Sequence, residues 1–427
     1  MDSQQRVRWL WLRTLILTAV VAIVGGKARA SPTAAGGGGS GFGLENSLLS
    51  EERRQNEAVF RFYENVLDIL QCRVPEEQQI INARQADGGD AHLAARQPVQ
   101  DQNWKSPRGL GQISGVSVDP QGRPVVFHRG DHVWDYHAFD SRHRYRRAKA
   151  GPIAANTVLT LNPASGEIED GWASETFYMP HGVHVDTWGN YWLTDVALHQ
   201  VFKYPRRERF GMGELEPSLV LGERFVPGSD GQHFCQPTAV AVMPETGEIV
   251  IADGYCNDRI LVLDPQGKMI GQLPPKGNED YLRLSVPHSL TIMKRGDICV
   301  ADREHQRIVC FNLARALRPQ ESSNKEQIML PWLPLTVHRP GVCRIFGVTS
   351  HDDMLYAVNG PTTSNNPVMG FTLNPDSKSI LSTWGPTFDS FSNPHEIAAC
   401  PNGTALYVSE IGPNIVWKFR LLTNWKM

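Results

Sequence analysis

The sequence has little net charge. Its 427 residues include 42 Lys and Arg against 45 Asp and Glu, which gives a formal net charge of −3 at pH 7. A dedicated nucleic-acid-binding protein normally carries a basic excess, so this balance argues against nucleic-acid partners. Hydrophobic residues make up 41% and charged residues 20%, and this ordinary composition excludes a wholly disordered or fibrous chain.

The sequence also lacks an apolar run of the roughly 20 residues that a membrane-spanning helix requires. The apolar run at 15–24 follows three arginines and precedes the small-residue site at 28–30. A basic start, a short apolar segment and such a cleavage site are typical of a secretory signal peptide. We therefore expect residues 1–30 to be a signal peptide. The protein is then soluble and secreted or held in the lumen of the secretory pathway, including secretory granules, without stable membrane insertion.

Helical patterns are scarce and are confined to the N-terminal part of the chain. We expect residues 31–105 to form a mostly disordered extension, which contains a flexible Gly-rich segment that ends at Ser40. Apolar residues recur at helical spacing within 50–72, so this segment predicts one amphipathic helix. The 38 glycines, 29 prolines and 11 tryptophans of the chain fit many short strands joined by tight turns.

Cysteine is present in an odd number. In the expected oxidising compartment most of the 7 cysteines should pair, which leaves one unpaired. The sequon Asn402-Gly403-Thr404 lies in an expected turn and predicts an N-glycan on Asn402.

One pattern repeats from residue 108 onward. Each unit has a short alternating strand, a Gly-containing turn, a second strand that ends near an acidic residue, and a third strand. Units begin near residues 114, 180, 237, 287, 344 and 394. Strands at this period, without helical runs between them, are typical of a β-propeller. We therefore predict an all-β fold, a six-bladed β-propeller over 108–427, as one domain because the ring must close. A β-sandwich array or an open solenoid is the alternative.

Three histidines occur at one phase of alternate units. His181, His288 and His395 each follow a proline at the start of a first strand, and successive ones are 107 residues apart. The first strand of each blade lines the channel of a propeller, so we expect these imidazoles to converge on one axial point. Three histidines with an open fourth position are typical of a catalytic zinc site.

Further candidates follow the second strands of their blades. Arg129, Tyr255 and Arg303 share this position, so we expect them to surround one mouth of the channel. An arginine can bind a carboxylate through two parallel hydrogen bonds, and its charge lowers the pKa of a nearby tyrosine by favouring phenolate.

The cysteine positions agree with this arrangement. Cys299 and Cys310 can face each other across a hairpin. Cys235 and Cys256 fall in loops that can lie on one rim, where a disulfide would brace the loop of Tyr255. The partners of the remaining cysteines stay open, and these are Cys72, Cys343 and Cys400.

Six stretches carry a resemblance to a known family. They are residues 126–134, 189–203, 227–238, 253–257, 286–290 and 299–303. With these stretches, the region from about 108 to the C-terminus resembles the peptidyl-α-hydroxyglycine α-amidating lyases (peptidylamidoglycolate lyases), the second catalytic half of the peptide-amidating enzymes. Residues 31–105 have no recognised counterpart.

The resemblance implies a six-bladed propeller of NHL-like blades with catalytic Zn²⁺ and structural Ca²⁺ in its channel. It implies Tyr255 as the base, with Arg129 and Arg303 engaging the substrate. The zinc ligands that it implies are His181, His288 and His395. The calcium ligands that it implies are the side chain of Glu396 and the carbonyls of Val116 and Val183. Because the family usually has Asp where this chain has Glu396, calcium is less firmly implied than zinc.

The resemblance also implies the disulfides Cys235–Cys256 and Cys299–Cys310. Its reaction cleaves a peptide that ends in α-hydroxyglycine into a peptide amide and glyoxylate, the second step of neuropeptide and hormone amidation. A separate copper monooxygenase would supply these peptidyl-α-hydroxyglycine substrates, and we expect a monomer.

Two other functions are compatible with a secreted propeller. A calcium-dependent propeller lactonase or esterase would rest on acidic and Asn ligands rather than phased histidines. A non-catalytic binding module would use its rims for proteins and would need no metal-ligand ring.

Overall fold

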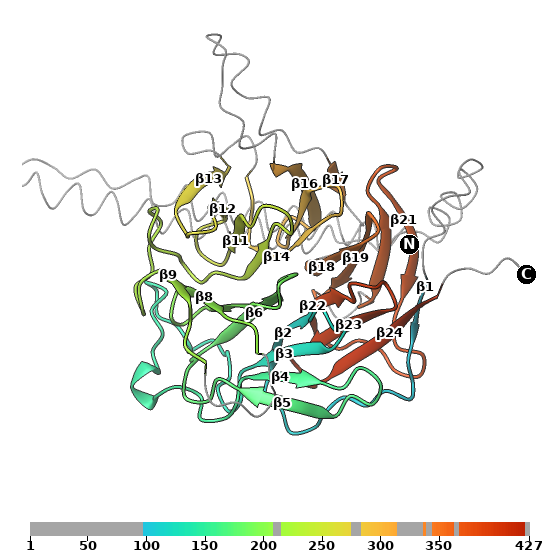
Figure 1. The fold of residues 1–427 in the computed structure, drawn as a ribbon, viewed down its shortest axis with the longest axis horizontal. Coiled ribbons are helices and arrows are strands. Elements are labelled where there is room, and N and C mark those ends of the chain that lie inside the picture. Colours follow the sequence, from blue (N-terminus) through green and yellow to red (C-terminus); the bar gives the residue numbers. More distant parts are fainter. Residues whose placement is uncertain are drawn as a thin grey trace, which may run out of the picture. The chain divides into compact units, whose positions relative to one another are not determined.

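Four-stranded antiparallel sheets surround a common axis in the computed structural model of the chain, which describes residues 97–207, 215–274, 283–313, 336–338, 344–362 and 367–422. These residues form six sheets and belong to one unit, Glu64–Met427. Figure 1 shows the sheets arranged as the blades of a propeller. The predicted all-β, six-bladed propeller is confirmed.

The first strand of each blade lies innermost, as predicted. Five of the six sheets run in sequence order from this strand outward, because short antiparallel strands join through tight turns. The inner strands are β2 (Ile113–Val118), β6 (Pro180–Val185), β10 (Ala239–Val242), β14 (Pro287–Ile292), β18 (Ile345–His351) and β22 (Pro394–Ala399). Blades 1 to 6 are numbered in the order of these inner strands.

The second and third strands complete the middle of each blade. The second strands are β3 (Pro124–His128), β7 (Tyr191–Asp195), β11 (Ile249–Asp253), β15 (Asp297–Asp302), β19 (Met354–Asn359) and β23 (Ala405–Glu410). The third strands are β4 (Val158–Leu161), β8 (Gln200–Tyr204), β12 (Arg259–Leu263), β16 (Arg307–Asn312), β20 (Gly370–Asn374) and β24 (Val416–Leu422).

Each blade also has an outer fourth strand, which the repeat pattern did not predict. These strands bury few residues, so their sequences alternate weakly. They are β5 (Ile168–Trp172), β9 (Leu219–Leu221), β13 (Met269–Leu273), β17 (Thr336–His338), β21 (Ser379–Trp384) and β1 (Gln97–Gln100).

The sixth blade joins the two ends of the propeller. Strand β1 pairs antiparallel with β24, with Gln97 opposite Leu422 and Gln100 opposite Phe419, and Figure 1 shows the blue strand beside the red one. The expected boundaries are therefore wrong here, because residues 97–100 were assigned to the extension. Among the described residues the propeller begins at Gln97 rather than near 108, because β1 supplies the outer strand of the blade that contains the C-terminal strands.

Six apolar clusters fill the spaces between neighbouring blades. Strand β11 shows how one strand serves two of them. Ile249 and Ile251 pack toward blade 2, whereas Val250 and Ala252 pack toward blade 4. Because side chains alternate between the two faces of a strand and both faces are covered, the sequence of β11 is a continuous apolar run.

The expected signal peptide at 1–30, the helix at 50–72, Cys72 and Cys343 lie outside the described residues. Within the described part of the chain, no helix has the length and apolar character to cross a membrane. Cys400 is buried, and its thiol is free there.

Candidate active site

The three phased histidines occupy the same place in alternate inner strands. Each is the second residue of its strand, His181 in β6, His288 in β14 and His395 in β22. At each histidine the pairing with the next strand shifts register, and such a bulge re-aims a side chain. The ring centroids lie 4.6 to 4.9 Å apart, and one ligand atom from each ring lies within 4.8 Å of the others. The structure therefore brings the three predicted ligands together on the axis.

Each imidazole is fixed by the blade that follows it. The Nδ1 to carbonyl distances are 2.7 Å from His181 to Thr238, 2.8 Å from His288 to Phe346 and 2.6 Å from His395 to Ser114. A carbonyl only accepts hydrogen bonds, so each Nδ1 carries the proton and each Nε2 keeps its lone pair. Even-numbered blades thus supply imidazoles and odd-numbered blades supply the carbonyls that orient them.

Close approach of the inner strands makes this arrangement possible. Gly182 follows His181, and a Cβ at this position would lie 2.5 Å from the carbonyl oxygen of Thr238. Only glycine lets the two blades come close enough for His181 to reach that carbonyl.

Burial keeps the three histidines neutral. It lowers the pKa of His181 and His288 well below the ordinary value and that of His395 to about 3. The charge of Arg129 lowers the pKa of His181 and His395 further. Neutral imidazole is the form that binds a metal ion.

Tyr255 lies in the turn after β11 and reaches the histidine ring. Its Oη is 2.9 Å from Nε2 of His181 and 3.1 Å from Nε2 of His288. The ring of Trp134 packs against the ring of Tyr255, with 4.8 Å between the centroids. The phenol is therefore held where a group bound at the three histidines would meet it.

Two arginines oppose the effect of burial on Tyr255. Burial raises the pKa of this phenol above its ordinary value, whereas Arg303 and Arg129 lower it. The sequence predicted that nearby arginines favour the phenolate, and their effect has that sign. Their effect is smaller than that of burial, so the pKa of this phenol stays above its ordinary value.

The two arginines are held by different contacts. Arg129 is buried, donates to the carbonyl of Pro180 at 3.0 Å and to Oε1 of Gln112 at 2.8 Å, and stacks on Trp134 at 5.2 Å. Burial lowers the pKa of Arg129 to about 10, so it stays charged at neutral pH. The Arg303 guanidinium lies 5.3 Å from the centroid of the Tyr255 ring.

Two aromatic side chains that border the site were not predicted from the sequence. Trp134 packs on Tyr255 and lies 6.3 Å from His181, and Phe346 lies 5.2 Å from His288. Phe346 holds the same place in blade 5 that the histidines hold in even blades, so their phase could have identified it. Trp134 belongs to an irregular loop between β3 and β4, and no periodicity marks it.

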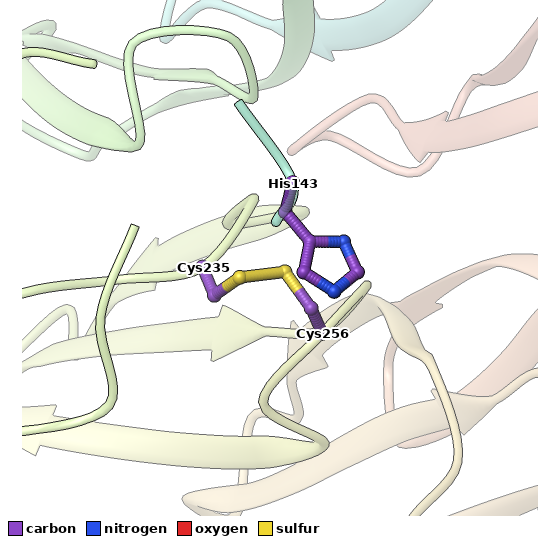
Figure 2. A group of neighbouring side chains, drawn as sticks. All are labelled: His143, Cys235 and Cys256. Carbon is purple, nitrogen blue, oxygen red and sulfur yellow. A yellow bond between two sulfur atoms is a disulfide. The ribbon is translucent and has the colours of Figure 1, made fainter. Parts of the chain in front are cut away.

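A disulfide braces the turn that carries Tyr255. Cys235 and Cys256 are bonded, and Figure 2 shows His143 beside them. His143 and the two sulfurs lie close enough to suggest a metal site, but the sulfurs are bonded to each other and cannot act as thiolates. Cys299 and Cys310 are also bonded, across the β15–β16 pair. Both disulfides implied by the family resemblance are thus present.

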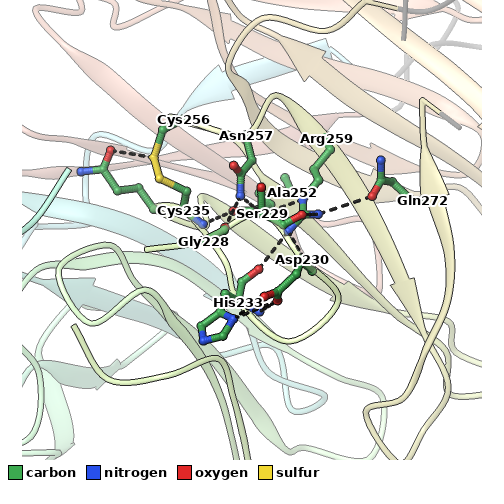
Figure 3. A network of polar contacts seen from close by, with 12 residues as sticks. Gly228, Ser229, Asp230, His233, Cys235, Ala252, Cys256, Asn257, Arg259 and Gln272 are labelled. Atoms are coloured by element: carbon green, nitrogen blue, oxygen red, sulfur yellow. Dashed lines mark hydrogen bonds and ion pairs between the residues drawn. A yellow bond between two sulfur atoms is a disulfide. The ribbon is translucent and has the colours of Figure 1, made fainter. Parts of the chain in front are cut away.

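A network of buried and partly buried hydrogen bonds anchors the same turn (Figure 3). Asp253, the last residue of β11, accepts from the Cys235 amide at 2.7 Å, from Asn257 at 2.7 Å and from Arg259 at 2.9 Å. Arg259 also donates to three carbonyls of the loop at 229–233. The turn at 253–257 is therefore anchored on both sides of Tyr255.

The residues implied for calcium line the channel beyond the histidines. Val116, Val183 and Glu396 border one cavity of about 230 Å³. Glu396 accepts from Oγ of Ser289 at 2.8 Å and from the amide of Ile397 at 2.9 Å. Burial raises the pKa of Glu396 to about 8, and among the described residues no cationic side chain pairs with it.

The chain is similar to known proteins both in its repeats and over most of its length. Residues 234–263 and 284–311 match the NHL repeat. The chain is 43% identical over 330 residues to peptidyl-alpha-hydroxyglycine alpha-amidating lyase 2 of Drosophila melanogaster, covering 76% of each protein. It is 32% identical over 319 residues to a Caenorhabditis elegans protein described as a probable peptidyl-alpha-hydroxyglycine alpha-amidating lyase, covering 73% of this chain and 83% of that protein.

A third relative is much longer. The chain is 41% identical over 317 residues to the peptidyl-glycine alpha-amidating monooxygenase of Mus musculus, covering 73% of this chain but 30% of that protein. The chain covers most of the length of these two lyase relatives. Membership of their family favours an enzyme over the binding module, and a lyase over the lactonase. The chain therefore belongs to the peptidyl-α-hydroxyglycine α-amidating lyases, and it is a lyase of peptide amidation.

Proposed function

We propose that the protein is a zinc-dependent lyase that converts a peptide ending in α-hydroxyglycine into an α-amidated peptide and glyoxylate. One observation carries the proposal. Three neutral imidazoles from alternate blades converge beside a partly buried tyrosine and two arginines. A substrate with a carboxylate and a hydroxyl proton to lose fits these groups.

The donor set fits a zinc ion. His181, His288 and His395 present Nε2 lone pairs, and each Nδ1 is tied to a carbonyl as in many zinc sites. A bound zinc ion would supply Lewis-acid chemistry at this point and lower the pKa of an oxygen placed against it.

The side chains around the three histidines divide the remaining work. Arg129 and Arg303 bind the substrate carboxylate and stabilise negative charge that develops during cleavage. Tyr255, as phenolate, removes the proton of the α-hydroxyl. The carbon–nitrogen bond then breaks as the carbonyl of glyoxylate forms, and the proton passes from Tyr255 to the amide nitrogen, which restores the phenolate. Trp134 and Phe346 limit access of water to these groups.

Calcium is proposed for the second position in the channel. A carboxylate as buried as that of Glu396 is costly without a compensating charge. Glu396 with the carbonyls of Val116 and Val183 would supply oxygen ligands of the kind that calcium prefers. The longer side chain of Glu, in place of Asp, still reaches this cavity.

The proposed route of the protein is secretory. The expected signal peptide, the two disulfides and the exposed sequon agree with this compartment. In the sequon, Thr404 donates to Oδ1 of Asn402 at 2.6 Å, and Asn402 is exposed at the β22–β23 turn. A separate copper monooxygenase would supply the substrate.

The direct test is incubation of the purified protein with a synthetic α-hydroxyglycine peptide, with and without a chelator. We expect glyoxylate and peptide amide in equal amounts, loss of both after chelation, and recovery with zinc. Metal analysis of the same sample should find zinc near one per chain, and calcium that is lost in Glu396→Gln. Full activity in metal-free protein would contradict the proposal.

A further inference from the structure

Glu304 lies beside the site and has no role in the chemistry described above. It is 8% exposed and sits in the turn between β15 and β16, directly after Arg303. Its Oε1 accepts from Nε of Arg303 at 2.9 Å and lies 2.8 Å from Nη2 of the same guanidinium. Both contacts join one edge of the guanidinium to the same oxygen, so Glu304 sets the direction in which this edge faces.

Two aromatic rings complete the clamp on Arg303. The guanidinium carbon lies 5.3 Å from the Tyr255 ring centroid and 5.0 Å from that of Phe346. An arginine side chain is long and rotamer-rich, and stacking alone leaves it free to slide over the rings. Glu304 supplies the directional contact that sets where the charge lies relative to Tyr255.

A third charged residue shares the carboxylate of Glu304. Nε of Arg344 lies 2.8 Å from Oε2, the oxygen that Arg303 does not use. Arg344 directly precedes β18, so this pair also links blade 4 to blade 5. One carboxylate between two guanidiniums leaves a net positive charge. Without Arg344, the negative charge of Glu304 would be balanced by Arg303 only, and the pair would carry no net charge.

We propose that Glu304 and Arg344 are positioning residues for the lyase reaction and act through Arg303. Glu304 orients the guanidinium beside Tyr255. The positive charge of Arg344 offsets part of the negative charge of Glu304, so Arg303 stays available to an anionic substrate. This inference rests on the proposed role of Arg303 in binding the α-hydroxyglycine carboxylate.

Steady-state kinetics on the full chain separate the two roles. Glu304→Gln keeps the shape but loses the charge, and we expect kcat to fall about 10- to 100-fold with KM not raised. In Arg344→Met we expect KM for the anionic peptide to rise about fivefold, because Glu304 then screens Arg303. Arg344→Lys keeps the charge and should restore most of that loss.

The chain offers a matched control on the opposite face of the same two blades. Arg295, 33% exposed, bonds Asp297 of blade 4 and Asp376 of blade 5, as Arg344, 26% exposed, links the same blades near the site. Arg295→Met should lower the melting temperature about as much as Arg344→Met, with kcat and KM unchanged.

The outcomes distinguish this inference from the proposed function. Loss of activity in Arg303→Met, with wild-type kcat in Glu304→Gln and wild-type KM in Arg344→Met, would overturn the positioning roles alone. Wild-type activity in Arg303→Met would instead contradict the role of Arg303 in the proposed function. Equal kinetic effects of Arg295→Met and Arg344→Met would assign both pairs to stability only.

Discussion

The chemistry proposed for the site depends on individual atoms of a few residues. The Nδ1 atoms of the three histidines are tied to carbonyls, and this leaves only Nε2 to face the axis. Tyr255 contacts two of these nitrogens through one oxygen. Changes of single atoms at these residues should therefore affect the reaction far more than they affect the fold.

Tyr255→Phe removes one oxygen and keeps the ring packed against Trp134. We expect glyoxylate release to fall about 10²- to 10⁴-fold, the range typical for loss of a general base. The melting temperature and the zinc content should stay near those of the wild type, because the histidines and the aromatic packing remain. A variant that releases glyoxylate at the normal rate would refute the assignment of Tyr255 as the base.

The free energy of unfolding should depend on pH through the buried side chain of His199. Burial lowers its pKa to about 4 from an ordinary value of 6.5, and its Nδ1 accepts from the Gln236 amide. Between these values the unfolded chain binds more protons than the folded protein. The stability from this group is therefore complete above pH 6.5 and is lost as pH falls through 6.5 toward 4, by about 2 kcal/mol from pH 7 to pH 5.

His199→Asn is the matched variant for this prediction. The residue has a φ of 56°, which asparagine tolerates, and the amide does not titrate. Denaturant unfolding at pH 7 and pH 5 should show a smaller loss of unfolding free energy on acidification than in the wild type, by about 2 kcal/mol. An equal loss in both proteins would show that His199 is not the titrating group.

At the scale of elements, the turn that carries Tyr255 is held by its disulfide. Replacement of Cys235 and Cys256 by serine should lower the unfolding free energy by about 3 kcal/mol, as expected for the loop that this bond closes. It should also lower kcat, because the turn loses one of its two anchors. Chemical unfolding and glyoxylate assays on one preparation measure both effects.

The second disulfide gives the control. Cys299 and Cys310 join neighbouring strands within blade 4, where β15 and β16 are already paired. Serine at both positions should lower stability and leave kcat at the wild-type value. If the two double variants lose kcat equally, the disulfide at the rim has no particular effect on Tyr255.

Strand β1 closes the ring, so its loss should be felt throughout the propeller. A chain that starts at residue 96 keeps every described strand, whereas one that starts at residue 102 leaves β24 as an open edge. We expect the shorter chain to melt lower by roughly 3–6 °C, since about 2–4 kcal/mol of pairing is lost. Identical melting curves would mean that β1 adds nothing to closure.

The sequence predicted those elements whose side chains are buried on both faces. Inner and second strands such as β11 are continuous apolar runs, and the phase of the histidines follows the inner strands directly. Strand β1 escaped prediction because it has four residues, lies far from its partner in sequence and buries few side chains. Glu304 and Trp134 escaped because turns and loops have no periodicity, and only the closed ring brings them to the site.

At the scale of the whole molecule, blades that supply a histidine alternate around the ring with blades that supply the carbonyl that orients it. Three blades contribute imidazoles and three contribute the carbonyls that orient them, so the proposed metal site can form only when all six blades close. Six apolar clusters between blades make that closure rigid. We therefore expect zinc binding and lyase activity to be lost together when this closure is disturbed.

Titration of metal-free protein with zinc, with glyoxylate release as the readout, tests this most directly. We predict that activity rises linearly to a plateau at one zinc per chain, and that His288→Ala, with one ligand removed, neither binds this zinc tightly nor gains activity. Normal glyoxylate release before any zinc is added, or full activity in His288→Ala, would contradict a metal centre formed by alternate blades.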